Sequence, residues 1–253
     1  MNRFIECAGV GKIYPGKDEP VEALRGIDFA CDAGDFVCLL GRSGCGKSTL
    51  LQMMAGLEAP TAGRIAVAGR PLDGPSPDAA IVFQDHGLFP WMTVQKNVEF
   101  NMKARGVRAG VRSAVAAQFI EMTGLTGFEG RYPHELSGGM RQRVGIARAL
   151  TTDPKALLMD EPFGALDAQT RGNLQDELLQ IWQQQRTTVL FITHSIDEAL
   201  LLADRILVFT PRPGRIAADI EVDLPRPRTP QSAAFSALAR QLRGLVGADR
   251  DFD

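Results

Sequence analysis

The sequence has 253 residues, of which 45% are apolar and 23% are charged, as in folded globular proteins and unlike disordered or fibrous chains. Its 28 basic and 30 acidic residues leave a net charge of −2, which speaks against general nucleic-acid binding because such proteins usually carry a basic excess. At about 150 residues per domain, the length favours one large domain.

Four short apolar runs predict strands that are buried on both faces of a largely parallel sheet. In chain order these runs cover residues 36–40, 79–83, 156–159 and 187–193, and they end at Gly41, Gln84, Asp160 and His194. Two further segments, 21–29 and 64–68, predict antiparallel strands at an edge. Because ligands of open α/β sheets bind beyond the carboxyl ends of the strands, we expect one active site where the four runs end.

Between about residues 90 and 150 the apolar spacing becomes helical, most clearly over 111–124 and 139–150, which predicts an inserted helical subdomain. The later sequence PRPRTPQ has the composition of a linker, and an amphipathic helix is expected over residues 233–246. The predicted organisation is a single domain over residues 1–253, with an α/β core (1–90 and 151–224), a helical subdomain (91–150), and a C-terminal linker and helix (225–253).

The four cysteines, at positions 7, 31, 38 and 45, form no C-x-x-C pair, and with three histidines they cannot complete a zinc-type cluster. We therefore expect no disulfide scaffold and a reducing compartment. No apolar run approaches the roughly 18 to 20 residues that span a bilayer. We expect neither a membrane span nor a secretory signal in this chain.

The segment from Gly41 to Ser48 reads GRSGCGKS and matches the phosphate-loop pattern G-x-x-x-x-G-K-[ST], between a predicted strand and a helix over residues 49–56. Its glycines allow successive backbone N–H groups to surround phosphate oxygens, and the helix adds its positive N-terminal end. Lys47 is expected to neutralise the β- and γ-phosphates, and the Ser48 hydroxyl to coordinate Mg²⁺. A glycine-rich turn that binds nothing is the alternative, which the strand–loop–helix context disfavours.

Two adjacent acids, Asp160 and Glu161, follow the apolar run at 156–159. Because successive strand residues point in opposite directions, these two carboxylates are expected to have different roles. Asp160 suits the shell of a magnesium ion, and Glu161 can orient or deprotonate the attacking water, a contribution of roughly 10²- to 10⁴-fold in rate. Acids that are merely solvated or cap the next helix are the alternative reading.

A second glycine-rich helix start lies at Ser137, Gly138 and Gly139, before the helical run that continues through VGIARAL. A hydroxyl and two glycines at a helix N-terminus form a second anion site. Together with GRSGCGKST, ALLMDEP and His194 in this order and spacing, the sequence LSGGM makes the chain resemble the ATP-binding cassette subunits of ABC transporters. The resemblance covers about residues 3–222.

The resemblance implies an ABC-type P-loop NTPase fold with a mixed, largely parallel sheet core, an antiparallel β edge and an inserted helical subdomain. It implies ATP and Mg²⁺ as ligands, with Tyr14 stacked on adenine and Gln84 in contact with magnesium and water. Two cassettes would pair head to tail, so that the segment 137–139 contacts the partner's nucleotide. The segment 165–167 would then communicate between the subunits, and His194 would contact the γ-phosphate.

The expected site residues fall into three groups. The catalytic residues are Lys47, Gln84, Glu161 and His194. The ATP-binding residues are Tyr14, Gly41, Arg42, Ser43, Gly44, Cys45, Gly46, Lys47, Ser48, Thr49, Gln84, Ser137, Gly138, Gly139 and Asp167. The magnesium ligands are Ser48, Gln84 and Asp160.

The absence of a membrane span implies separate transmembrane subunits, as in bacterial importers. The aromatic stretch 84–94 resembles the groove that receives a cytoplasmic coupling helix, although Leu88, Phe89 and Trp91 can instead fill a joint between subdomains. The sequences of segments 84–94, 196–200 and 210–216 resemble those of the nitrate, sulfonate, taurine and bicarbonate importer branch.

The expected partners are a second cassette, two permease subunits and, indirectly, a periplasmic or extracellular solute-binding protein, with no nucleic acid. The expected location is the cytoplasmic face of the bacterial inner membrane. A soluble ABC-type ATPase that acts as a regulatory or assembly module is the alternative. A P-loop GTPase or small-molecule kinase is disfavoured, because no [NT]-K-x-D segment is present and the LSGGM helix would have no purpose.

Overall fold

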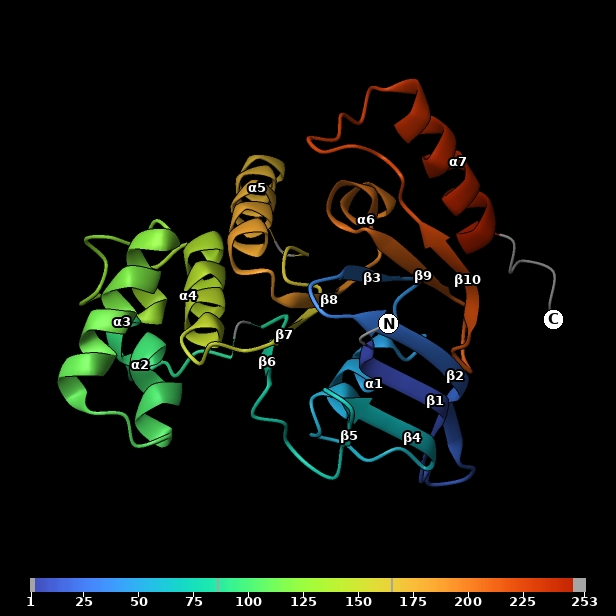
Figure 1. Cartoon of the computed structure of the whole chain (residues 1–253), viewed down its shortest axis with the longest axis horizontal. Coiled ribbons are helices and arrows are strands. Elements are labelled where there is room, and N and C mark those ends of the chain that lie inside the picture. Colours follow the sequence, from blue (N-terminus) through green and yellow to red (C-terminus); the bar gives the residue numbers. More distant parts are fainter. Residues whose placement is uncertain (1–2, 86, 165, 248–253) are drawn as a thin grey trace. The chain divides into compact units, whose positions relative to one another are not determined.

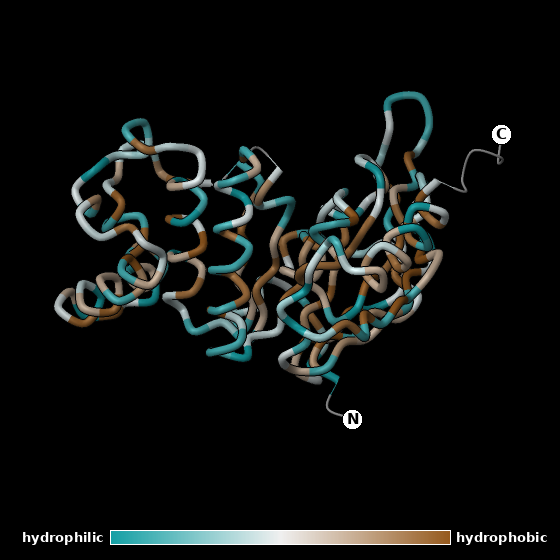
Figure 2. The backbone as a smooth tube through the Cα atoms, turned by 90° about the horizontal axis from the view of Figure 1, so that it is seen from above, coloured by the Kyte–Doolittle hydropathy of each residue, from teal (hydrophilic) through white to brown (hydrophobic). Residues whose placement is uncertain are grey.

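The structure is a computed structural model, and it describes residues 3–85, 87–164 and 166–247. The chain divides into two compact units. The first unit combines residues 1–76 with residues 188–253, and the second unit covers residues 77–187. Hydrophobic segments run through the interior of each unit, whereas hydrophilic segments dominate the connecting loops (Figure 2).

The first unit begins with an antiparallel sheet in the order β2-β1-β4-β5 (Figure 1). Its strands are β1 (Arg3–Tyr14), β2 (Val21–Asp32), β4 (Ala62–Val67) and β5 (Arg70–Pro71). The predicted edge strand 21–29 lies within β2, and the predicted strand 64–68 overlaps β4 and runs one residue past its end; β1 was not predicted. Its pairing with β2 shifts in register around Gly9 and Gly11, so the simple alternation that marks a strand is interrupted there.

The second sheet of this unit has the order β10-β9-β3-β8. Its strands are β3 (Phe36–Leu40), β8 (Thr188–Thr193), β9 (Arg205–Phe209) and β10 (Ile216–Glu221). Strand β3 runs parallel to both β8 and β9, and every residue of β3 and β8 is buried. The predicted parallel strands at 36–40 and 187–193 are therefore confirmed, the second beginning one residue later than expected.

In the part of this unit that the structure describes, three helices pack with the sheets. They are α1 (Lys47–Met54), α6 (Ile196–Leu202) and α7 (Ala233–Gly247). Helix α7 buries Phe235, Ala239 and Leu242 and packs against α6 and β9. Its spacing of apolar residues predicted this amphipathic helix almost residue for residue.

The second unit contains two parallel strands and the helical part of the chain. Its elements are β6 (Ala79–Val82), α2 (Val94–Ala104), α3 (Ala109–Met122), a 3₁₀ turn (Pro133–Glu135), α4 (Gly138–Leu150), β7 (Ala156–Asp160) and α5 (Ala168–Gln185). Helices α2, α3 and α4 share a core that includes Val98, Ile120 and Val144. The mixed α/β architecture with an antiparallel sheet and a helical insertion is thus confirmed.

Within the described residues, no helix has both the length and the apolar character required to cross a membrane.

Candidate functional site

The loop between β3 and α1 has a backbone that only glycine adopts readily. Gly44 and Gly46 have φ angles of +81° and +96°, in the left-handed region. A Cβ on Gly46 would lie 2.7 Å from a methyl carbon of Leu24 and 2.8 Å from the carbonyl oxygen of Ala23. Gly46 also precedes α1 without providing a side-chain cap, so the first N–H groups of this helix are aimed at the loop. This is a backbone cradle for an anion.

Lys47 is folded back over this loop. Its side chain is buried, and its Nζ donates hydrogen bonds to the carbonyl oxygens of Gly41 (2.8 Å) and Arg42 (2.9 Å), with Cys45 Sγ at 3.5 Å. The ammonium is therefore held at the loop by neutral acceptors. Charged phosphate oxygens are stronger acceptors for an ammonium than carbonyls, so the arrangement suits a phosphate ligand.

The turn from β9 to β10 packs against the phosphate loop. Gly214 donates its N–H to the Ala23 carbonyl (3.0 Å) and accepts from the Arg25 N–H (3.0 Å). A Cβ on Gly214 would come within 2.0 Å of the Cys45 carbonyl oxygen. Arg212 donates to the Gly44 carbonyl oxygen at 3.3 Å. Sequence reasoning gave this turn no part in the site, because its contacts join residues far apart in the chain.

We expect Gly214→Ala to weaken ATP binding about tenfold, because the added methyl must displace the Cys45 carbonyl and with it the cradle of N–H groups. The dissociation constant for ATP, measured by titration calorimetry, tests this expectation. Gly244→Ala is the matched control, since a Cβ at that position in α7 meets no atom within 4 Å. Equal affinities for the two variants would contradict a supporting role for Gly214.

His194 lies at the same sheet edge as the phosphate loop. Leu40 is the register partner of Thr193 in the parallel pair β3–β8, so both strands end together. The turn after β8 is fixed locally: the Thr193 hydroxyl donates to the Glu198 carboxylate and accepts from the Ser195 N–H at 3.0 Å. Ser195 also caps α6 by accepting the Glu198 N–H at 3.3 Å. The imidazole of His194 is exposed.

Tyr14 ends β1 and is half-buried. The ammonium of Lys12 lies 5.0 Å from the centroid of its ring, a cation–π arrangement. Lys12 is itself buried, pairs with Glu58 and donates to the Ala59 carbonyl at 2.7 Å. Lys12 thus restricts the Tyr14 ring. A single lysine in a strand gives no sequence signal for this role.

The second unit holds Gln84, Asp160 and Glu161. Strands β6 and β7 are parallel, with Val82 opposite Met159. The exposed Gln84, which follows β6, and the half-buried Asp160, which ends β7, therefore lie at the same edge of this strand pair. The two acids were predicted to point in opposite directions as neighbours in one strand, but Glu161 lies outside the strand. Strand β7 ends at Asp160, and Glu161 has a left-handed backbone (φ +43°). Such strained conformations of non-glycine residues are typical of functional sites.

The start of α4 combines a cap with close helix packing. The Ser137 hydroxyl accepts the Met140 N–H at 3.2 Å and so caps the helix. A Cβ on Gly139 would lie 2.5 Å from the Thr170 methyl in α5, so glycine is needed here for packing. Asp167 caps α5 by accepting the N–H groups of Thr170 and Gln169, and these hydrogen bonds lower the pKa of its carboxyl group. Contacts of these residues with ATP stay predictions.

The predicted communication segment 165–167 is described only in part, because Ala165 lies outside the described residues, as does His86 of the aromatic stretch. Leu166 is buried. The predicted site residues are therefore divided between the two units. The phosphate loop, Tyr14 and His194 belong to the first unit, and Gln84, the two acids and the segment 137–139 belong to the second.

The aromatic stretch forms one wall of a cavity of about 420 Å³ in the second unit, whose lining includes Phe83, Phe89, Phe100 and Arg148. The rings of Phe89 and Phe100 are 4.2 Å apart, and Arg148 donates to the Gly87 carbonyl at 2.7 Å. Burial lowers the pKa of Arg148. Leu88 packs against the helical core, whereas Trp91 remains 69% exposed, so the stretch both fills an interior gap and presents a surface.

Comparison with known proteins gives consistent matches. A family model described as ABC transporter matches residues 24–164. The nitrate import ATP-binding protein NrtD of Synechocystis sp. is 47% identical over 221 residues, covering 87% of this chain and 83% of that protein. The aliphatic sulfonates import ATP-binding protein SsuB of Bacillus cereus is 45% identical over 240 residues, covering 94% of each. A solved dimeric post-hydrolysis state of the ATP-binding cassette MJ0796 bound to ADP and Pi is 29% identical, with a TM-score of 0.79 over 87% of this chain and 99% of that chain.

Proposed function

The chain belongs to the ABC transporter family as an ATP-hydrolysing cassette, and we propose that it powers import of a small solute through separate membrane subunits. The proposed solutes are of the nitrate, sulfonate, taurine or bicarbonate type; nitrate and sulfonates appear in the names of the two relatives described above, and bicarbonate appears in the name of another. The glycine-dependent N–H cradle with the buried Lys47 ammonium at its centre supports ATP as the source of energy, and the names of the relatives support import as its use.

Within this proposal the loop 41–49 binds the phosphates of ATP, and Tyr14, backed by Lys12, stacks on the adenine. Glu161 orients and deprotonates the water that attacks the γ-phosphorus, giving ADP and inorganic phosphate. His194 contacts the γ-phosphate and stabilises the closed state. The negatively charged phosphates of ATP would face the positive N-terminal end of α1 and the ammonium of Lys47. These positive groups stabilise the charge that develops during phosphoryl transfer.

Ser48 of the first unit and Asp160 and Gln84 of the second are the proposed magnesium ligands, because hydroxyl, carboxylate and amide oxygens are donors suited to this hard cation. When bound there, Mg²⁺ would neutralise charge on the phosphates. We further propose that residues 1–90 and 151–224 act as the ATP-binding core, 91–150 as the helical subdomain, and 225–253 as a C-terminal extension.

A second copy of the chain is the proposed partner across the nucleotide, with Ser137, Gly138, Gly139 and Asp167 contributing to the other copy's ATP. Two permease subunits are proposed to bind at the aromatic cavity, which places the chain at the cytoplasmic face of the membrane. The exposed Trp91 supports this assignment, because aromatic side chains with an accessible face anchor protein interfaces. A solute-binding protein would act outside the membrane.

Co-purification tests the transport assignment. The tagged chain, extracted from membranes of its own cells in mild detergent, is expected to bring down a multi-span membrane protein. Trp91→Ala should reduce that recovery about tenfold, since truncating an interface tryptophan commonly costs more than about 1 kcal/mol of binding free energy. Phe128→Ala, which alters another exposed apolar residue of the same unit, is the control. Full ATPase activity with no multi-span partner in any preparation would favour the soluble regulatory module instead.

A further inference from the structure

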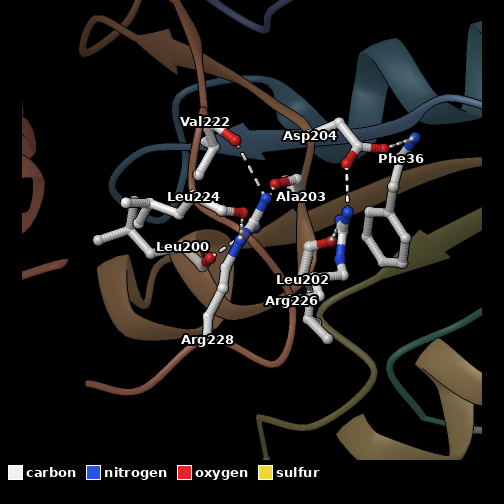
Figure 3. A network of polar contacts seen from close by, with 9 residues as sticks. All are labelled: Phe36, Leu200, Leu202, Ala203, Asp204, Val222, Leu224, Arg226 and Arg228. Atoms are coloured by element: carbon white, nitrogen blue, oxygen red, sulfur yellow. Dashed lines mark hydrogen bonds and ion pairs between the residues drawn. The ribbon is translucent and has the colours of Figure 1, made fainter. Parts of the chain in front are cut away.

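Two arginines in the segment after β10 bind the C-terminal end of α6 (Figure 3). Arg228 donates from Nη1 to the carbonyls of Leu200 (2.7 Å) and Ala203, and its other N–H groups reach the carbonyls of Leu224 (3.0 Å) and Val222 (3.1 Å). Composition alone predicted a linker here. We call Arg226 and Arg228 with these contacts the arginine clamp.

Arg226 extends the clamp toward β3. Its guanidinium donates to the Leu202 carbonyl and pairs with the carboxylate of Asp204 (Figure 3). The other oxygen of Asp204 accepts the N–H of Phe36 at 3.3 Å. Phe36 is the first residue of β3, the strand that leads directly into the phosphate loop. The clamp therefore contacts α6, which follows His194, and is linked through Asp204 to β3, which precedes the phosphate loop.

The clamp supplies what α6 lacks by itself. A helix of seven residues is too short to be stable alone, and the last carbonyls of any helix have no donors within it. The two guanidinium groups provide those donors, and positive charge is favourable at a helix C-terminus. The arrangement has an opposing cost, since burial and the neighbouring Arg226 lower the pKa of Arg228 to about 10. Arg228 therefore remains cationic at neutral pH.

At its other end α6 begins immediately after His194. Ser195 caps the helix, and the Thr193 hydroxyl bonds to Glu198 in its first turn. A shift of α6 along its axis or sideways would therefore move the turn that carries His194. The helix is a rigid connection of seven residues between the clamp and that turn.

We propose that Arg228 and Arg226 are positioning residues of the ATPase, which hold His194 in register with the phosphate loop by fixing the far end of α6. The proposal rests on the proposed contact of His194 with the γ-phosphate. Neither arginine is proposed to touch ATP. Their effect reaches the reaction through α6 and His194.

Steady-state ATPase kinetics of Arg228→Met test the proposal. Methionine replaces the unbranched part of the side chain as far as the position of Nε and removes all the guanidinium donors. We expect kcat to fall about tenfold, in line with the sensitivity of catalysis to displacements of about an ångström, while the dissociation constant for ATP changes less than about twofold. Arg228→Lys, which restores the charge and part of the donor set, should recover some of the loss. Arg240→Met, in an exposed position of α7, is the matched control and should behave as the wild type.

A double-mutant cycle with His194→Ala separates positioning from general destabilisation. If Arg228 acts through His194, adding Arg228→Met to His194→Ala should lower kcat no further. A full additional tenfold loss in that background would overturn the proposal, as would wild-type kcat for Arg228→Met itself. Wild-type kcat for His194→Ala would instead overturn the role of His194 in the proposed function.

The milder Asp204→Asn provides a second route if Arg228→Met does not fold. It weakens the pairing with Arg226 and keeps an oxygen for the Phe36 N–H. A smaller fall in kcat with unchanged ATP affinity is expected, again absent in the His194→Ala background. An equal fall in both backgrounds would overturn the proposal.

Discussion

Replacing Lys47 with alanine is expected to abolish measurable ATP hydrolysis, with kcat/KM reduced about 10³-fold. The ammonium is buried at the centre of the loop and bonded to the carbonyls of Gly41 and Arg42. When phosphate replaces these neutral acceptors, a full positive charge faces the charge that develops on the transferred group. Among the loop residues 41–49, Lys47 is the buried cation, whereas Arg42 is exposed. Release of inorganic phosphate by the purified chain measures the effect.

The control for this variant is Lys17→Ala, which removes an exposed lysine from the same unit. Thermal unfolding of both variants shows whether the loss of a buried side chain has also weakened the fold. Lys47→Ala leaves two loop carbonyls without their donor, so a modest destabilisation of about 1–3 kcal/mol is expected. Normal turnover in a folded Lys47→Ala variant would remove the phosphate-loop assignment.

The strands in which every residue is buried were predictable from the sequence. The run at 36–40 is apolar at every position, and all five residues of β3 are buried. Helix α4 was predicted to within one residue because Ser137 is a typical cap. Helix α5 was not predicted, although Leu174, Leu178 and Ile181 recur at helical spacing and are buried. This helical spacing was present in the sequence, but the glutamines on the exposed side of α5 obscured it.

The site residues were predictable as types, because phosphate binding needs glycines, a cation and hydroxyls in a fixed order. Their supporting contacts were not, since each joins distant parts of the chain. Lys12 under Tyr14, Gly214 against Cys45, and Arg228 at the end of α6 have no local pattern. The expectation of one site shared by the ends of four strands stays a prediction.

Replacing Glu161 with glutamine is expected to reduce hydrolysis by about 10²- to 10⁴-fold and to leave ATP binding intact. Glutamine has nearly the shape of glutamate and can occupy the same left-handed turn, where the Gly164 N–H bonds the residue 161 carbonyl at 3.2 Å. It cannot accept a proton from water. Because ATP then stays uncleaved, the closed pair of cassettes should accumulate.

Light scattering with size-exclusion chromatography measures this accumulation as a mass twice the 27.4 kDa of one chain, seen with ATP and not with ADP. Ser137→Arg in the same variant is the informative control, because it blocks the proposed contact with the other copy's nucleotide while leaving the first copy's phosphate loop unaltered. The double variant should bind ATP as a monomer. A Glu161→Gln variant that binds ATP and stays monomeric would contradict head-to-tail closure, since uncleaved nucleotide is the only condition that closure then requires.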